Sequence, residues 1–359
     1  MWPYWAAFLI SALAASTERA ASASSLGQEN KRDHPLWIAT GFALTLFIGY
    51  RFEVGGDWFN YLDHVDSLWG MSLGEALTLP DPGYQILNWL SLQMGWGVFG
   101  TNLIGGGIFA FGLVVFCRSL ERPRLAFCIA IPYLIIVVAM GYSRQGIALA
   151  CAMIGLVALQ RRSTVKFVAW VMLGATFHKT AVLLLPLGAF AYSQGWLIRV
   201  AWISLGTIIG YFLFLAESSE TLYAGYIEAE YQSEGALVRL LMNVVPAAIL
   251  LLKWRQFRSF AAITPIWKWV AWLSLALLVV LFLTPSSTAV DRVALYFLPL
   301  QLLVFSTLPD ALTPRGGSPR GAVTMILAYY ALVLFVWLNF AEHSKYWIPY
   351  RFYPLELAF

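Results

Sequence analysis

One short polar segment stands between two very apolar stretches and has the residue types for acid–base chemistry. It is Phe177-His178-Lys179-Thr180, flanked by the apolar segments 165–176 and 181–193. A neutral imidazole can act as a general base near pH 7, and the adjacent ammonium group can bind phosphate. The alternative is a short interfacial turn whose polar groups are all satisfied. From this segment alone, the two interpretations are equally supported.

Three arginines near predicted helix ends suggest a site for an anion. Arg144 lies at a turn between two apolar helices. A helix N-terminus favours anions, so a guanidinium there indicates an anionic ligand, with snorkelling to the membrane surface as the alternative. Arg292 follows Asp291, which we expect to cap its helix. With Arg51, these side chains would offer the planar, bidentate donors that suit a diphosphate.

The longest polar interruption covers residues 49–83 and contains four Asp, two Glu and one Arg. Asp57, within this stretch, is a second candidate for a general base. The four histidines are scattered, and the Asp63-His64-Val65-Asp66 group is as typical of a polar surface as of a metal site. The sequence has no GxxxxGK[ST] pattern of a nucleotide-binding loop. We therefore expect a site without a metal or a cofactor.

The composition indicates a helical membrane protein. Of the 359 residues, 60% are hydrophobic and only 12% are charged, with a mean hydropathy of +0.71. A soluble domain usually has roughly twice that charged fraction, because charge covers its surface. Lipid admits only helices or closed barrels, and the apolar runs are too continuous for the alternating pattern of a barrel strand. The expected fold class is all-α, a polytopic helical integral membrane protein.

We expect one transmembrane domain over residues 1–359 with about twelve spans. The expected spans are 1–15, 35–50, 102–117, 125–140, 144–160, 165–178, 180–193, 197–215, 236–252, 264–284, 290–308 and 321–340. Residues 1–23 are expected to include a retained first helix, with a cleaved signal peptide as the alternative. Residues 51–100 are expected to form an external loop that carries an interfacial or re-entrant helix at 84–97.

Basic residues predict the orientation, because cytoplasmic connections carry an excess of Lys and Arg. The basic connections hold Arg118, Arg122, Arg124, Arg161, Arg162, Lys166, Lys253, Arg255, Arg258, Arg315 and Arg320. The loop 216–235 has five Glu and no Lys or Arg, which predicts an acidic external loop. When the chain is followed through the expected spans with this orientation, six candidate residues lie at the non-cytoplasmic face: Arg51, Asp57, Arg144, His178, Lys179 and Arg292. The net charge of +4 gives no indication of a nucleic-acid partner.

Several short motifs occur in order along nearly the whole chain. They are Tyr50-Arg51-Phe52-Glu53-Val54-Gly55-Gly56-Asp57 with Tyr61, Asp81-Pro82-Gly83-Tyr84, Ser143-Arg144-Gln145-Gly146-Ile147-Ala148, Phe177-His178-Lys179-Thr180-Ala181, Arg292 with Tyr296, and Asn339 with Trp347-Ile348-Pro349-Tyr350. The chain thereby resembles the EpsG family of Wzy-like exopolysaccharide and O-antigen polymerases. Members of that family show R-x-x-x-G-x-D-x-x-x-Y, R-Q-x-x-A and F-H-x-[ST]-A. The order and spacing of the motifs carry the resemblance, since each motif alone is weak.

The resemblance implies a membrane glycosyltransferase of the bacterial cytoplasmic (inner) membrane, with a GT-C-like architecture as one option. Its substrates would be undecaprenyl diphosphate-linked repeat units, joined at an active site that faces the periplasm or exterior. The growing glycan would leave undecaprenyl diphosphate and pass to a sugar hydroxyl of the next lipid-linked unit. The donor bond already holds the energy, so no nucleotide is required. Membrane lipids, a chain-length regulator and export machinery are the other implied partners.

The resemblance and the charges together predict roles for individual residues. We expect the diphosphate to be held by Arg51, Arg144, Arg292 and Lys179. The base would be His178 or Asp57, and the sequence does not separate them. We expect sugar stacking from Tyr61, Tyr84, Trp58 and Trp347, although aromatic residues at a membrane interface more often form a belt.

Two other function classes compete with the polymerase. One is a transporter, such as a flippase for lipid-linked oligosaccharide, and the other is a membrane O-acyltransferase acting on glycans. Carriers commonly have inverted repeats and charged residues at the bilayer midplane. Here the charges gather at one end, which favours a surface-facing enzyme. An O-acyltransferase would also need an acyl donor and a route to it.

Overall fold

The computed structural model describes residues 1–18, 34–190, 235–284, 287–314 and 317–356, together with the isolated positions 197, 201, 204 and 208. Within these residues the chain is helical, without any strand, and its one extended pairing is an isolated bridge between Arg51 and Phe352. The expected all-α class is confirmed. The expected acidic loop 216–235 lies outside the described residues except for Gly235, and so does nearly all of the expected span 197–215.

Among the described residues, four helices are long and apolar enough to cross a membrane. They are α7 (Gly97–Cys117), α9 (Ser143–Gln160), α15 (Ile266–Leu283) and α18 (Arg320–Phe340). A fifth candidate is the bent pair Ser287–Phe297 and Pro299–Leu312, whose two parts meet at 45°. Shorter apolar helices lie at His34–Gly49, Pro123–Ala139, Thr164–Phe177, Lys179–Gly188 and Ala236–Leu252. These helices make the chain a membrane-integral protein, while the count of twelve spans stays a prediction.

The remaining elements complete the bundle and one lobe beside it. They are α1 (Trp2–Ser16), α3 (His34–Gly49), α4 (Trp58–Asp66), α5 (Leu73–Ala76), α6 (Pro82–Gln93), α8 (Pro123–Ala130), the π-helix η1 (Ile131–Ala139), α10 (Thr164–Phe177), the 3-10 helix η2 (Lys179–Phe190), α13 (Ala236–Leu252), α14 (Trp254–Phe257), α16 (Ser287–Ala294), η5 (Leu295–Phe297), α17 (Pro299–Leu312), η6 (Glu342–Tyr346) and α19 (Tyr353–Glu356).

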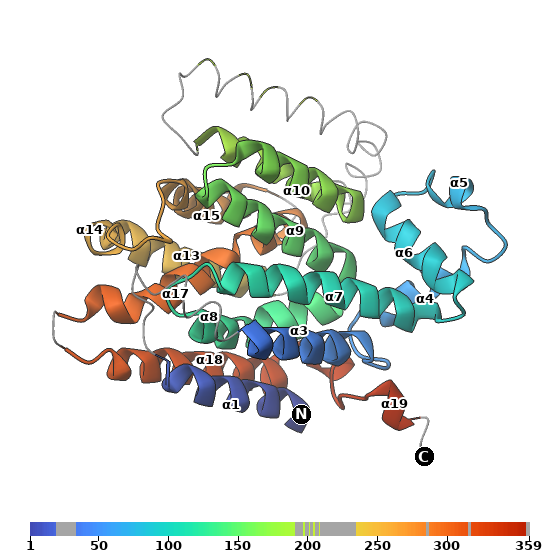
Figure 1. Cartoon of the computed structure of the whole chain (residues 1–359), viewed down its shortest axis with the longest axis horizontal. Coiled ribbons are helices and arrows are strands. Elements are labelled where there is room, and N and C mark those ends of the chain that lie inside the picture. Colours follow the sequence, from blue (N-terminus) through green and yellow to red (C-terminus); the bar gives the residue numbers. More distant parts are fainter. Residues whose placement is uncertain are drawn as a thin grey trace.

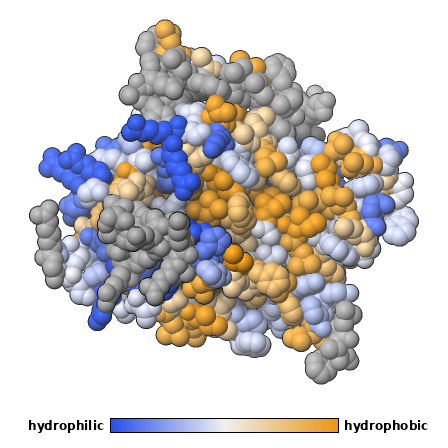
Figure 2. Space-filling view, viewed as in Figure 1, coloured by the Kyte–Doolittle hydropathy of each residue, from blue (hydrophilic) through white to orange (hydrophobic). Residues whose placement is uncertain are grey.

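The long helices lie side by side, with the short helices α4, α5 and α6 at one end of the bundle and α14 at the other (Figure 1). In the same view, hydrophobic residues gather across the middle of the molecular surface, and the most hydrophilic ones lie toward the α14 end (Figure 2). An apolar band between polar ends is the surface that a bilayer requires.

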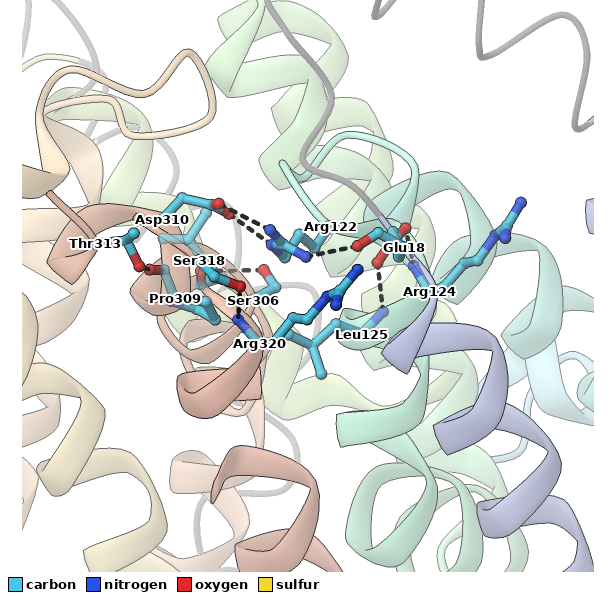
Figure 3. Close-up of polar contacts among 11 residues, drawn as sticks. Glu18, Arg122, Arg124, Leu125, Ser306, Pro309, Asp310, Thr313, Ser318 and Arg320 are labelled. Atoms are coloured by element: carbon cyan, nitrogen blue, oxygen red, sulfur yellow. Dashed lines mark hydrogen bonds and ion pairs between the residues drawn. The ribbon is translucent and has the colours of Figure 1, made fainter. Parts of the chain in front are cut away.

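Single helices show which polar groups share an end. α9 begins at Ser143, whose hydroxyl accepts a hydrogen bond from Arg51, and ends at Gln160, whose side-chain amide donates to the carbonyl of Ala262. α17 reaches the Gln160 side of the bundle with Asp310, which pairs with Arg122 (Figure 3). We therefore call the two ends the Arg51 end and the Arg122 end.

Two sequence expectations about helix boundaries need correction. The span expected at 290–308 is broken into α16, η5 and α17, because Pro299 begins a new helix at an angle to the first. Asp291 does not cap this segment, since α16 is already helical from Ser287. Its carboxylate instead accepts a hydrogen bond from Arg239 at 2.6 Å. The expected interfacial helix at 84–97 begins earlier, at Pro82, and ends at Gln93.

The first helix, α1, is an integral part of the bundle. Tyr4 and Phe8 are buried, and the Tyr4 hydroxyl donates to the backbone carbonyl of Trp347 at 2.7 Å. At its far end, the Glu18 carboxylate accepts the backbone N–H groups of Arg124 and Leu125 at the start of α8. These contacts support the interpretation of α1 as a retained helix.

Candidate active site

His178 lies in the break between α10, which ends at Phe177, and η2, which begins at Lys179. Its Nδ1 is 2.7 Å from the hydroxyl oxygen of Thr180, and that hydroxyl donates to the Tyr296 hydroxyl at 3.3 Å. A hydroxyl that donates to Tyr296 can accept from a protonated Nδ1, which leaves the basic lone pair on Nε2. Among the described residues, Nε2 has no hydrogen-bond partner.

Three positive charges act on the His178 imidazole, and they belong to Arg144, Arg292 and Lys179. These residues come from the start of α9, from α16 and from the start of η2. The structure therefore brings together four of the residues to which the sequence assigned chemistry. We call Arg144, His178, Lys179 and Arg292 the His178 cluster.

Arg144 is held by a carboxylate that the sequence had placed in a motif without giving it a role. One terminal nitrogen of Arg144 donates to Asp81 at 2.9 Å, and the Arg144 side chain stays 34% exposed. The same carboxylate also accepts the backbone N–H of Lys179. Burial raises the pKa of Asp81, while the Arg144 guanidinium beside it acts in the opposite direction. Asp81 thus joins the starts of α6, α9 and η2.

The backbone at Asp81 is itself unusual. Asp81 precedes α6 with φ at 58° and ψ at 60°, in the left-handed region that non-glycine residues seldom adopt. Such strain persists where surrounding contacts hold it, and it often lies at functional sites. Here the ion pair with Arg144 is such a contact. The sequence shows Asp81 directly before Pro82 and Gly83, and only the structure shows its left-handed backbone.

Arg292 has the most open guanidinium of the cluster. It lies over the ring of Tyr142, with its central carbon 4.3 Å from the ring centroid. Its guanidinium forms no hydrogen bond or ion pair with any residue that the structure describes. The backbone is fixed instead, because the Gln145 side chain donates to the Arg292 carbonyl at 2.6 Å. The nitrogen donors of Arg292 are therefore available to a ligand.

Arg51 is placed differently from the other three cations. Its side chain is fully buried and lies 5.7 Å from the centre of the Trp58 ring. It donates to two backbone carbonyls, to Asn102 at 3.0 Å and to Ser143 at 2.8 Å. Since Asn102 is in α7 and Ser143 opens α9, Arg51 holds two helix starts together. This placement suits a residue that positions Arg144 rather than one that contacts a ligand.

Asp57 lies on the α4 side of the same region. It immediately precedes α4, is half-buried, and has a weak contact of 3.5 Å with the Asn60 amide. Its charge acts on Tyr61, on which Arg144 and Arg292 act as well. Asp57 and two members of the His178 cluster, Arg144 and Arg292, are therefore close enough for their charges to act on one tyrosine.

The four aromatic residues expected to stack on sugars are all buried. Trp58, Tyr61, Tyr84 and Trp347 are each no more than 3% exposed. The Trp347 indole donates to the carbonyl of Ile136 at 2.7 Å, which satisfies a carbonyl of η1. The Tyr84 hydroxyl is buried without a hydrogen-bond partner in the described part of the chain. In this structure none of the four rings offers an open face to a sugar.

Several residues around the cluster had no role assigned from the sequence. Thr180 orients His178, Tyr142 supports Arg292, and Gln145 fixes the backbone of α16. All three lie within two residues of a motif arginine or histidine, so proximity along the chain was the available signal. Arg239 gave no such signal, because its partner Asp291 is 52 positions away.

Apolar helices with a cationic cluster at one end define a membrane-integral helical protein with a polar site at the Arg51 end. The pattern of the EpsG family matches residues 35–352. The chain belongs to the EpsG family, and the resemblance expected from the sequence is confirmed. Family membership indicates, at a general level, a Wzy-like polysaccharide polymerase with glycosyltransferase-like activity. A comparison with curated proteins found no match, and neither did a comparison with solved structures.

Proposed function

We propose that this protein lengthens a polysaccharide by transferring the growing glycan from undecaprenyl diphosphate to a sugar hydroxyl of a lipid-linked repeat unit. The reaction takes place at the Arg51 end of the bundle, on the outer face of the bacterial cytoplasmic membrane. The observation that carries the proposal is the His178 cluster, in which the charges of three cations act on an imidazole whose Nε2 has no hydrogen-bond partner among the described residues.

The cations of the cluster would bind the diphosphate. Arg292 has its donors available, and Arg144 uses only one nitrogen on Asp81. Guanidinium groups match the geometry of phosphate oxygens, and fixed positive charges stabilise the charge that develops on a leaving group. Lys179 adds a point charge at the same place. Arg51 would hold the start of α9 in position through its hydrogen bond to Ser143.

His178 is the base that we favour. Its Nε2 would take the proton of the acceptor hydroxyl while the hydroxyl oxygen bonds to the anomeric carbon of the donor. The bond between that carbon and the diphosphate breaks, and the electron pair leaves with the diphosphate. Before binding, burial first and then the three nearby cations lower the pKa of the His178 imidazole. A bound diphosphate would offset the charges of those cations and so raise the basicity of Nε2.

Asp57 remains the alternative base, because its charge acts on Tyr61, on which Arg144 and Arg292 act as well. The pair of variants His178→Gln and Asp57→Asn separates the two assignments. Loss of the base slows general acid–base catalysis by about 10²–10⁴-fold. We expect that loss in His178→Gln and a smaller effect in Asp57→Asn.

The test uses purified protein in lipid nanodiscs with a lipid-linked repeat unit as the sole substrate, analysed by gel and mass spectrometry. Lengthened glycan on lipid supports the proposal. Movement of the lipid across a vesicle bilayer without new glycosidic bonds indicates a flippase, and an added acyl mass indicates an acyltransferase. Arg255→Ala, an exposed arginine in α14, is the matched control for variants of the cluster.

A further inference from the structure

An apolar cavity of about 700 Å³ lies between α13, α18 and η1. α13 lines it with Leu241, Met242 and Val245, and α18 with Leu332, Val336 and Phe340. Its volume falls within the roughly 300–1,000 Å³ that is usual for small-molecule sites in proteins. Several wall residues are also exposed at the surface of the bundle, including Val245 at 44% and Val336 at 47%. The cavity is therefore a groove whose apolar walls reach the surface of the bundle.

The polar groups of this groove are gathered at one end. α13 begins at Ala236 and α18 ends at Phe340, and near these two points the lining includes Arg239, Glu342 and His343. Arg239 is paired with Asp291 of α16, the neighbour of Arg292. The groove thus has an apolar body and a charged mouth, and the mouth belongs to the Arg51 end.

The mouth leads directly to the His178 cluster. Tyr142 lines the groove with one part of its side chain, and its ring carries the guanidinium of Arg292 at 4.3 Å. A molecule with its chain in the groove and a phosphate at the mouth would therefore meet Arg292. The apolar walls and the charged mouth of the groove match a lipid with a hydrocarbon chain and an anionic head.

We propose that this groove holds the polyprenyl chain of the lipid diphosphate donor and guides its diphosphate to Arg292. The proposal rests on the proposed function, since it assigns the donor to the site already described. It makes Tyr142 the border between the chain and the head group. It also gives the Arg239–Asp291 pair the task of holding α13 against α16 at the mouth.

The test is photo-crosslinking with a polyprenyl diphosphate that carries a diazirine in its chain, added to the protein in phosphatidylglycerol nanodiscs. We expect labelled peptides from α13 and α18, and competition by unlabelled polyprenyl diphosphate but not by extra phosphatidylglycerol. Val245→Trp and Val336→Trp fill the groove from its two walls and should each lower the labelling at least tenfold. Val279→Trp, at a 58% exposed position of α15, is the matched control and should leave labelling unchanged.

Three outcomes would overturn the proposal: labelling of other helices instead, equal competition by phosphatidylglycerol, or unchanged labelling in both tryptophan variants. Polymer formation is measured in parallel to keep the two proposals apart. If both tryptophan variants form polymer with full activity, the groove assignment is wrong and the proposed polymerase function is unaffected. Specific labelling of the groove in wild-type protein that makes no polymer removes the polymerase and leaves the lipid site.

Discussion

Two groups of charged residues at opposite ends of the bundle are built in opposite ways. At the Arg122 end, Arg122 is 3% exposed and donates two hydrogen bonds to Asp310, at 2.6 and 2.8 Å, and a third to the Glu18 carbonyl at 2.9 Å (Figure 3). At the Arg51 end, the guanidinium of Arg292 lies over the Tyr142 ring and forms no hydrogen bond or ion pair with any described residue. We call Glu18, Arg122 and Asp310 the Arg122 cluster.

The difference separates charges that hold the fold from charges that await a ligand. A buried charge whose hydrogen bonds are complete ties its elements together, and removal of one partner is strongly destabilising. The Arg122 cluster joins the end of α1 to α8 and α17 in this way. A cation with open donors beside two other cations is repelled by them. Under the proposed function, its position is explained by the diphosphate that it would bind.

Arg122→Ala should therefore destabilise the protein most, because it leaves the Asp310 carboxylate unpaired in a largely buried place. Breaking a buried ion pair from one side costs about 3–5 kcal/mol. The apparent melting temperature of the purified protein measures the effect. Arg255→Ala should leave it unchanged. An Arg122→Ala protein as stable as the wild type would remove the contrast between the two clusters.

Arg292→Ala should have the opposite effect, with a large loss of activity and little change in stability. Loss of one group that stabilises the leaving charge lowers the rate of polymerisation by about 10²–10³-fold. The stability should stay within about 1 kcal/mol of the wild type, because the contact with the Tyr142 ring is lost but no described hydrogen bond of the side chain is. Polymer yield and melting temperature are measured on the same preparation. A parallel fall in both would mean that Arg292 belongs with the structural arginines.

Glu18 provides a pH test of the Arg122 cluster. Burial raises the pKa of the Glu18 carboxyl to about 7. Its folded pKa then exceeds its unfolded value, so protonation favours the folded state. This stabilisation is complete at low pH and is lost as the pH rises through 7, with an upper limit of about 3 kcal/mol. The melting temperature should fall from pH 5 to pH 8 in the wild type and less in Glu18→Gln, and equal slopes would contradict the assignment.

The smallest effect is expected from Thr180→Val, which removes the hydroxyl that orients Nδ1 of His178. We expect polymerisation to fall about tenfold, or about 1.4 kcal/mol in the barrier, with an unchanged melting temperature. Thr180→Ser keeps the hydroxyl and should restore the rate. A displaced pH–rate profile in Thr180→Val distinguishes loss of orientation at the base from a packing defect. Full activity of Thr180→Val would show that this hydrogen bond does not orient the base.

Much of the architecture followed from the sequence, for physical reasons. Long apolar runs must form helices in lipid, so the helical class and the positions of α7, α9, α15 and α18 could be predicted. Following the expected spans along the chain also predicted that Arg144, His178 and Arg292 lie at one end of the bundle. Broken elements were harder to predict, because the division between α16 and α17 depends on how Pro299 is accommodated by its neighbours.

The state of each side chain could not be predicted from the sequence. Arg51 and Arg292 are both motif arginines at the same end of the bundle. The guanidinium of Arg51 donates hydrogen bonds to Asn102 and Ser143, whereas that of Arg292 donates none to the described residues. The partners that saturate Arg51 include Asn102 and Ser143, which are 51 and 92 positions away. Burial of Trp58, Tyr61, Tyr84 and Trp347 likewise depends on packing between distant segments. Residue type and spacing predicted the candidate site, and only the fold showed which of its side chains are hydrogen-bonded within the protein.

The central claim is that the open cations of the His178 cluster bind the diphosphate of the lipid donor. A cryo-EM reconstruction of the protein in nanodiscs saturated with undecaprenyl diphosphate tests it most directly. We predict diphosphate density between Arg144, Lys179 and Arg292, with the prenyl chain entering between α13 and α18. Well-defined lipid diphosphate bound at another place, with the His178 cluster left empty, would contradict the claim.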